Sequence, residues 1–397
     1  MADTIFQLGN PLAATILSDE VFQQASWGSP MARFMGYGKD AMLRIMRDLT
    51  RRPGDTIQYT LNKRLVGRGV IGFDHLEGKE ERMQSLPDQF SINDIRHAVK
   101  IVGEMTPQRV PWDMREQGQE DLSTWIKTRM GSWWGNQLGG NVNCGLGNMI
   151  PGGGIAGDLA YCGFNLPIAP ASTNQIYANS SITAESQLTD PGVNGINLMN
   201  LNMINRMVTM AETLAYPIRP LVIDGEPYYV LFMHPWQVND LMSAVGDATW
   251  QGWMMAAMKG GEITKNPIFT GALGMFRRVI FHKDVHVPAL DASQMPAAEL
   301  GTALGAAPAA GSTTAGATNV ARSIMCGSQA GVVAYGRKIE WPNQVKWVEE
   351  SFDYKSELGI ALELVAGVHK SGFTDDVTGS YFDAGVIVGS TYVNPPV

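Results

Sequence analysis

Apolar residues at helical spacing mark one long segment of the chain. Within residues 112–138 they fall on a single stripe, and charged residues lie mostly off it. The stripe consists of Leu122, Trp125, Ile126, Met130, Trp133, Trp134 and Leu138. A continuous helix over this segment is about 40 Å long at 1.5 Å per residue, and Gly139-Gly140 is expected to end it. A helix of this length is too long to be covered by a small core.

Shorter periodic segments predict further helices. The spacing predicts a helix over 40–51, which Pro53 ends, and a methionine-rich helix over 196–214, which also ends before a proline. A third helix is expected to start at His234-Pro235, because a proline in the first turn has no N–H that could be left unpaired.

Alternation of apolar and polar residues predicts a hairpin near the start of the chain. Ile57, Tyr59 and Leu61 alternate with polar residues, and a second strand pattern covers 89–92. The sequence between these strands is polar on both sides and contains several glycines. Such a hairpin offers few apolar residues to its own domain, so we expect it to project outward and to be ordered by another subunit.

The remaining strand patterns lie in the second half of the chain. They cover residues 228–233, 279–287, 331–335, 345–348, 359–368 and 385–391. Residues 291–320 are rich in Ala, Gly and Thr and contain no Lys or Arg, so they predict an exposed loop. Helices set against scattered antiparallel strands indicate an α+β protein.

The charge content changes this picture. Only 17% of the 397 residues are charged, against about 25% in a typical soluble domain, while Met and Trp number 22 and 10. This composition is typical of a surface that contacts other copies, and equally of one large core. The net charge of −8 argues against broad binding to nucleic acid or to anionic membranes. No apolar run spans a bilayer and no secretory pattern opens the chain, so we expect synthesis in the cytoplasm.

Candidate chemistry is sparse. A strand over 279–287 would place His282, Asp284 and His286 on one face, as a three-ligand cation site requires, but a solvated strand face explains them better. The three cysteines are too few for a disulfide framework or a closed zinc site. The sequence has no phosphate loop, nucleophile elbow or His-Glu-x-x-His motif, and the tryptophans suit a core better than a stacking platform. We therefore expect no enzymatic activity, no cofactor and no structural metal.

Several motifs occur in an order that resembles the major capsid proteins of tailed phages, and more narrowly the family typified by the N-four coliphage. The motifs are Pro-Gly-Asp-Thr-Ile at 53–57, Leu-Glu-Gly-Lys-Glu-Glu at 76–81, Ile-Arg-His-Ala-Val at 95–99, Phe-Met-His-Pro-Trp at 232–236, Asn-Pro-Ile-Phe-Thr-Gly-Ala-Leu-Gly-Met at 266–275, Phe-Asp-Tyr at 352–354 and Gly-Ile-Ala at 359–361. They extend through most of residues 50–390, and the segment at 266–275 is the most specific.

The resemblance implies the Hong Kong 97-type capsid fold and its parts. Residues 1–52 would form the N-terminal arm with a short helix, and 53–90 the extended loop that lies over a neighbouring subunit. Residues 91–150 and 340–397 would form the peripheral domain with its long spine helix. The axial domain would comprise 151–339, including the loop at 291–320.

The implied function is self-assembly. Hexamers and pentamers would form an icosahedral phage head around double-stranded DNA, with the subunit made in the bacterial host cytoplasm and then located in the virion. Portal, scaffold and decoration proteins stay open as partners, contact with DNA is expected to be weak and nonspecific, and no membrane contact is expected. Two alternatives also stay open: a phage tail tube or sheath, and a metal-dependent enzyme that uses His282, Asp284 and His286.

The predicted subunit contact is the charged part of the extended loop. A basic block is followed by a mainly acidic one, and complementary blocks of this kind orient partners. The residues are Lys63, Arg64, Arg68, Asp74, Glu77, Lys79, Glu80, Glu81 and Arg82.

Overall fold

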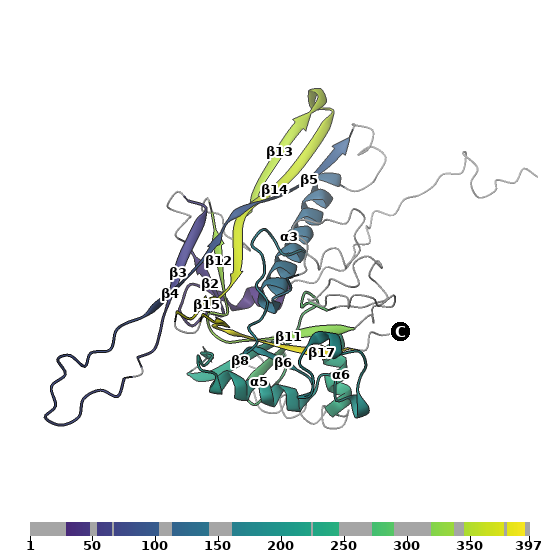
Figure 1. Ribbon diagram of the computed structural model, residues 1–397. Coiled ribbons are helices and arrows are strands. Elements are labelled where there is room, and N and C mark those ends of the chain that lie inside the picture. Colours follow the sequence, from purple (N-terminus) through teal and green to yellow (C-terminus); the bar gives the residue numbers. More distant parts are fainter. Residues whose placement is uncertain are drawn as a thin grey trace, which may run out of the picture.

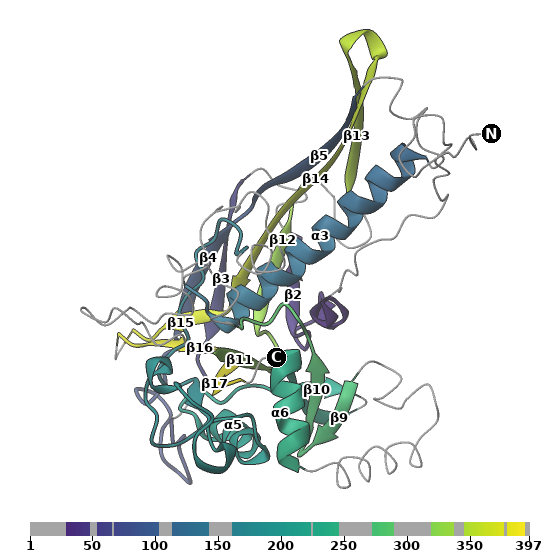
Figure 2. The ribbon, with the colours of Figure 1, turned by 90° about the vertical axis from the view of Figure 1, so that its right-hand side faces the viewer.

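The computed structural model shows two large sheets, a long helix that packs against both, and a two-stranded hairpin that projects from the body (Figures 1 and 2). It describes residues 29–47, 54–65, 67–102, 113–142, 161–223, 225–245, 272–289, 319–336, 345–376 and 379–393. The predicted loop at 291–320 and the specific motif at 266–275 lie largely outside these ranges. Within them, no helix is both long enough and apolar enough to cross a membrane.

The first sheet forms a long ribbon beside the helix. Its strands are β1 (Met35–Gly36), β2 (Leu43–Met46), β12 (Gly331–Tyr335), β14 (Glu357–Lys370) and β13 (Lys346–Phe352), in that order, and β5 (Asn93–Val102) pairs with the other edge of β14. Both β5 and β13 run antiparallel to β14. These three strands extend together beyond the rest of the sheet (Figure 1).

The predicted helix over 40–51 is wrong in its described part. Leu43–Met46 form strand β2, which pairs in parallel with β12 from Leu43 opposite Gly331 to Met46 opposite Ala334. Leu43 and Met46 are buried in this extended form. A short segment has little intrinsic helical stability, so pairing with β12 outweighs the helical spacing.

The second sheet has helices on one face and the end of the long helix on the other. Its order is β6 (Gln175–Tyr177), β17 (Val386–Tyr392), β11 (Val320–Cys326), β8 (Glu226–Met233), β10 (Val279–Lys283) and β9 (Ala272–Phe276), with β7 (Leu221–Ile223) paired to β8. Helices α5 (Leu201–Thr213) and α6 (Pro235–Val245) cover one face through a shared core. The other face packs against Trp133, Trp134 and Leu138 of the long helix.

The sheets divide the sequence differently from the predicted domain ranges. Strand β12 lies within the predicted axial range 151–339 but pairs with β14 of the first sheet. Strand β17 lies within the predicted peripheral range 340–397 but pairs with β11 of the second sheet. The chain therefore crosses between the two sheets more than once.

Helix α3 (Met114–Gly139) confirms the predicted long helix and its apolar stripe. Asp113 caps its start by accepting from the Arg115 N–H, and Gly140 ends it with a φ of 61° that favours glycine. Trp133 and Trp134 are fully buried, as core residues should be. Trp125 is half-buried and stacks on His97 of β5 with ring centroids 4.5 Å apart.

Glycines in the second half of α3 allow another segment to cross it at van der Waals distance. The ideal position of a Cβ at Gly135 lies 2.0 Å from the carbonyl oxygen of His286, and one at Gly139 lies 2.9 Å from the Pro288 ring. Only glycine fits at Gly135, because the obstacle is backbone. The segment that follows β10 can therefore lie directly on the helix.

The predicted hairpin consists of β3 (Thr56–Asn62) and β4 (Ser85–Ser91), which pair antiparallel along their whole length. Beyond Asn62 and Ser85 the chain leaves the body as a wide loop (Figure 1). We call the paired strands β3 and β4 the root of the hairpin. The remaining strands, β15 (Gly372–Thr374) and β16 (Tyr381–Asp383), pair with each other next to this root. Short 3-10 helices cover Pro30–Phe34, Glu185–Gln187, Val193–Gly195 and Asp353–Lys355.

Candidate subunit-contact surface

The root of the hairpin is part of the protein core. Ile57, Leu86 and Phe90 are buried, and the Tyr59 ring meets the rings of Phe90 and Phe373 edge-on at 6.0 and 5.8 Å. Apolar burial of this kind keeps the two strands in one position relative to the body.

Polar side chains at the root also hold the hairpin against the body. The Tyr59 hydroxyl donates to Asp88, and His369 Nε2 lies 3.4 Å from the same carboxylate. Burial raises the pKa of Asp88, but the hydrogen bonds from His369 and Tyr59 outweigh burial and hold this pKa below its ordinary value. Lys63, at the boundary between root and loop, forms an ion pair with Asp375.

The distal loop, defined as residues 64–84, has the opposite environment. All of its described residues except Val70 are exposed. Ile71 and Phe73 have exposed fractions of 89% and 106%, so they bury almost no apolar area against their own chain. Large exposed apolar side chains next to charged ones are typical of protein contact sites. The prediction that this loop projects outward is confirmed.

The predicted contact residues divide into three groups. Lys63 contacts its own chain through Asp375. Four acidic or basic side chains stabilise the loop itself: Glu81 Oε2 accepts from the Gly67 N–H at 2.6 Å, Glu80 Oε2 accepts from the Gly78 N–H at 2.8 Å, and Lys79 pairs with Asp74 at 3.0 Å. Arg64, Arg68, Glu77 and Arg82 are exposed. Their contact with another subunit stays a prediction.

The sequence analysis missed a second exposed surface, the ribbon formed by β13 and β14. Every residue of β13 is exposed, including Trp347, Val348 and Phe352. At its tip Asp353 and Tyr354 adopt positive φ angles of 45° and 52°, and the Tyr354 side chain is 103% exposed. The sequence signal for this surface was the presence of aromatic residues at 347, 352 and 354 among charged residues, in β13 and the turn that follows it.

The candidate cation site does not form. Strand β10 ends at Lys283, so His282, Asp284 and His286 do not share a strand face. They are also buried rather than solvated, which corrects the alternative interpretation. The His282 ring packs against the rings of Phe34 and Phe232, with centroid distances of 5.3 and 5.8 Å.

Asp284 instead anchors two segments. It accepts from the His286 N–H at 2.9 Å, its Oδ1 lies 2.8 Å from His286 Nδ1, and its Oδ2 accepts from the Ser29 hydroxyl at 2.5 Å. The carboxylate thus holds the N-terminal arm against the segment that crosses α3. Across the described part of the chain, no cluster of three or more His, Cys, Asp or Glu side chains could hold a metal ion.

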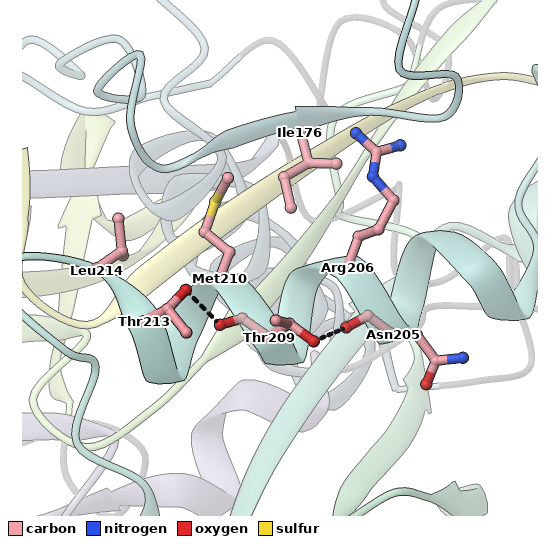
Figure 3. Close-up of a pocket in the computed structure, with 7 residues that line it drawn as sticks. All are labelled: Ile176, Asn205, Arg206, Thr209, Met210, Thr213 and Leu214. Atoms are coloured by element: carbon pink, nitrogen blue, oxygen red, sulfur yellow. Dashed lines mark hydrogen bonds between the residues drawn. The ribbon is translucent and has the colours of Figure 1, made fainter.

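A groove of about 520 Å³ lies beside α5 (Figure 3). It is lined by Ile176, Asn205, Arg206, Thr209, Met210, Thr213 and Leu214. Its hydroxyl groups bond within the helix, since Thr209 donates to the Asn205 carbonyl at 2.9 Å and Thr213 to the Thr209 carbonyl at 2.7 Å. Arg206 donates to the carbonyls of Tyr177 and Ala178 at 3.0 and 3.3 Å. Among the described residues that line the groove, none is an Asp, Glu, His or Cys.

The described part of the chain thus has two exposed surfaces, the distal loop and the β13–β14 ribbon. The family model described as "Phage capsid protein" matches residues 6–395, and the chain belongs to this family. It is 25% identical over 369 residues to the major capsid protein of Pseudomonas phage KPP25, across 90% of this chain and 89% of that protein.

Solved capsid structures have the same fold. The capsid of Ralstonia phage GP4 matches over 100% of both chains with a TM-score of 0.75 and 26% identity. The capsid of cyanophage Pam1 also matches over 100% of both chains, with a TM-score of 0.69 and 17% identity. The head of Helicobacter pylori bacteriophage KHP40 matches 97% of this chain and 96% of that chain, with a TM-score of 0.62 and 15% identity. The predicted α+β class, capsid fold and capsid function are confirmed, and the capsid function replaces the tail-tube alternative.

Proposed function

We propose that the chain is the major capsid protein of its phage, and that its copies join as hexamers and pentamers into an icosahedral head around double-stranded DNA. The main support is the distal loop, which exposes Ile71 and Phe73 on a rigid root. A loop with this composition is stabilised only when another subunit covers it. The relatives that match 90% or more of the chain are capsid proteins, which supports a second copy as that subunit.

The two large sheets suit the expected division of the subunit into a peripheral and an axial part. The first sheet with α3 corresponds to the peripheral part, to which β2 and β12 also belong. The second sheet with α5 and α6 corresponds to the axial part, which includes β17. The arm, the hairpin and the charged loop residues serve contact between subunits. No catalysis, metal or cofactor is needed for this role, and the protein is made in the host cytoplasm before it enters the virion.

Deletion of the distal loop tests this function. Residues 64–83 are replaced by Asn-Gly, a two-residue turn suited to an antiparallel hairpin. The change retains the Lys63–Asp375 pair and the bond from the Lys63 N–H to the Gln84 carbonyl, 2.9 Å long. The variant should fold and melt like the parent but form no closed shells in negative-stain electron microscopy. Normal shells from this variant would contradict the proposed role of the loop.

DNA binding gives an independent test. At a net charge of −8 the subunit cannot neutralise many phosphates, so its binding to duplex DNA should be weak, independent of sequence and steeply dependent on salt. Filter binding measures this directly. Tight, saturable binding that persists at about 0.2 M salt would show that the chain recognises nucleic acid instead of only enclosing it.

A further inference from the structure

A pocket of about 330 Å³ lies between strand β2 and the root of the hairpin. It is lined by residues 44–47, in and after β2, by residues 58–61 of β3, and by side chains next to β12 and β15. Among the described residues that line it, the charged ones are Arg44 and Arg47, and none is an Asp or Glu. We call this cavity the Arg44 pocket.

Arg44 has no anionic partner within the subunit. The residue is half-buried and makes no ion pair or hydrogen bond with any part of the chain that the structure describes. The acidic residues that flank the lining segments already have cations of their own. These pairs are Asp40 with Arg219, Asp375 with Lys63, and Asp383 with Lys370. A cation that is partly removed from water and unpaired is unfavourable, so the pocket favours an anion.

The open edge of β3 adds hydrogen-bonding groups to the pocket. The Lys63 N–H donates to the Gln84 carbonyl over 2.9 Å, so the odd-numbered residues of the antiparallel pair bond to β4. The N–H and C=O groups of Gln58 and Thr60 therefore point away from β4, and β3 has no second partner among the described strands. Both residues line the pocket, and neither side chain bonds to another described residue.

Aromatic side chains supply the rest of the pocket surface that the argument needs. The Arg47 guanidinium lies 3.7 Å from the centroid of the Tyr37 ring and donates to its hydroxyl. Arg47 is exposed and Tyr37 is 49% exposed, so they lie at the entrance, whereas Phe373 is buried. The entrance thus adds a second positive charge, and the rings offer apolar surface to an organic group.

The size and charge of the pocket indicate the class of ligand. Its volume is at the lower end of the range for small-molecule sites, about 300–1,000 Å³, and exceeds what a single oxyanion fills. A phosphate monoester carries a charge of about −1.5 to −2 at pH 7 and has three acceptor oxygens. Two arginines and two backbone N–H groups match that charge and those acceptors better than they match a single carboxylate.

We propose that the Arg44 pocket binds a small phosphate ester of about mononucleotide size. The phosphate group pairs with Arg44 and accepts from the β3 edge at Gln58, and the organic part of the ester lies against Tyr37 and Phe373. The edge carbonyls of β3 accept from its hydroxyl or amine groups. Such a ligand contacts both β2 and the root of the hairpin, so it stabilises the folded subunit. This binding site goes beyond the proposed function and does not depend on how the shell is built.

Titration calorimetry on the full-length, unassembled subunit tests the site. The probes are deoxyadenosine monophosphate, deoxyadenosine without phosphate, and inorganic phosphate. We expect one nucleotide per subunit, weaker binding of inorganic phosphate, and no saturable binding of deoxyadenosine. The nucleotide should also raise the melting temperature of the subunit in a concentration-dependent way.

Two variants and a matched control locate the binding. Arg44→Gln should weaken nucleotide binding by about tenfold or more, because a charged hydrogen-bond donor is lost. Gln58→Glu retains Arg44 but places a carboxylate in the pocket, and it should weaken binding by repulsion. Arg96→Gln makes the same charge change at an exposed position of β5 outside the pocket, so it should bind like the parent. Melting curves without ligand show that each variant is folded.

Three results would overturn the proposal. They are no saturable binding of the nucleotide by the folded parent, equal weakening by Arg44→Gln and Arg96→Gln, and displacement of the nucleotide by duplex DNA without terminal phosphates. The last result would assign the pocket to the phosphates of the DNA backbone instead of a small ester. None of these results affects shell formation, which the loop deletion tests separately.

Discussion

The second half of α3 and the distal loop of the hairpin differ in what surrounds them. From Arg129 to Gly139 every residue of α3 is buried, whereas the described residues of the loop are exposed apart from Val70. The helix is stabilised by its own chain on all sides, and the loop has almost no apolar contact within its chain. The comparison shows that the second half of α3 is packed within its own subunit, whereas contact of the loop with another subunit stays a prediction.

Burial of a helix end requires partners for its last carbonyl groups. Arg322 of β11 supplies them, because it donates to the carbonyls of Gly139 and Gly140 at 3.0 and 2.8 Å. The same guanidinium makes two hydrogen bonds, of 2.7 and 2.8 Å, to the Glu185 carboxylate, so the buried charge is paired. The distal loop has no comparable support, and its backbone is held mainly by Glu80 and Glu81.

The largest expected effect on stability is at the glycine contact of α3. Gly135→Val places a side chain against the backbone of His286, which is 2.0 Å from the ideal Cβ position. Overpacking at this rigid site should cost at least about 3 kcal/mol of unfolding free energy, measured by chemical denaturation of the isolated subunit.

Gly118→Ala is the matched control on the same helix. Its added Cβ would lie 3.6 Å from Ile360 and 3.8 Å from Val99, which are ordinary contacts. Alanine is favoured over glycine in a helix, so this variant should be more stable by about 0.5–1 kcal/mol. Equal effects of the two substitutions would show that the close approach at Gly135 is unimportant.

The next largest effect should come from acid. Burial lowers the pKa of His234 from 6.5 to about 4, and its Nδ1 accepts from the Trp236 N–H at 3.4 Å at the start of α6. The unfolded chain binds this proton more readily, so stability is full above about pH 6.5 and falls as the pH drops towards 4. The loss attributable to His234 should be about 3 kcal/mol.

Denaturant midpoints at pH 7 and pH 4 measure this loss. His234→Asn should reduce the pH dependence, whereas His75→Asn, a substitution at an exposed residue of the distal loop, should leave it unchanged. If His234→Asn shows the same pH dependence as the parent, protonation of His234 is not the cause of the acid sensitivity.

The smallest expected effect on stability belongs to the loop. Phe73→Ala should change the unfolding free energy by less than about 0.5 kcal/mol, because the ring is exposed, yet it should reduce the yield of closed particles. Phe232→Ala removes a fully buried ring and should cost about 3–5 kcal/mol. A comparable loss of stability from both variants would remove the contrast between loop and core.

Local patterns were sufficient for the elements that depend on neighbouring residues. The stripe and end glycines of α3, the Pro235 start of α6 and the projecting hairpin all follow from spacing or turn chemistry along the chain. The polar sequence of the loop also predicted its exposure, and its contact with another subunit stays a prediction. The two helices were predicted because their signals involve residues a few positions apart, and the hairpin because its strands and the loop between them are consecutive along the chain.

The exposure of β13 could not be predicted from local sequence patterns. Strand β13 was predicted only over 345–348, and its complete exposure follows from its place at the edge of the first sheet. An edge strand and a central strand have similar sequences when both contain aromatic and β-branched residues. Which of them is left open depends on the order of strands in the sheet.

The sequence by itself determined the α+β class, the long helix, the hairpin and the capsid family. Tertiary structure alone decided that Leu43–Met46 form a strand and that β12 belongs to the first sheet and β17 to the second. It also decided that His282, Asp284 and His286 are buried. Each of these outcomes depends on partners far away in the chain, such as β12 for β2 and Ser29 for Asp284. Strand pairing and burial join distant segments, and their free energies exceed the small preferences that a local pattern expresses.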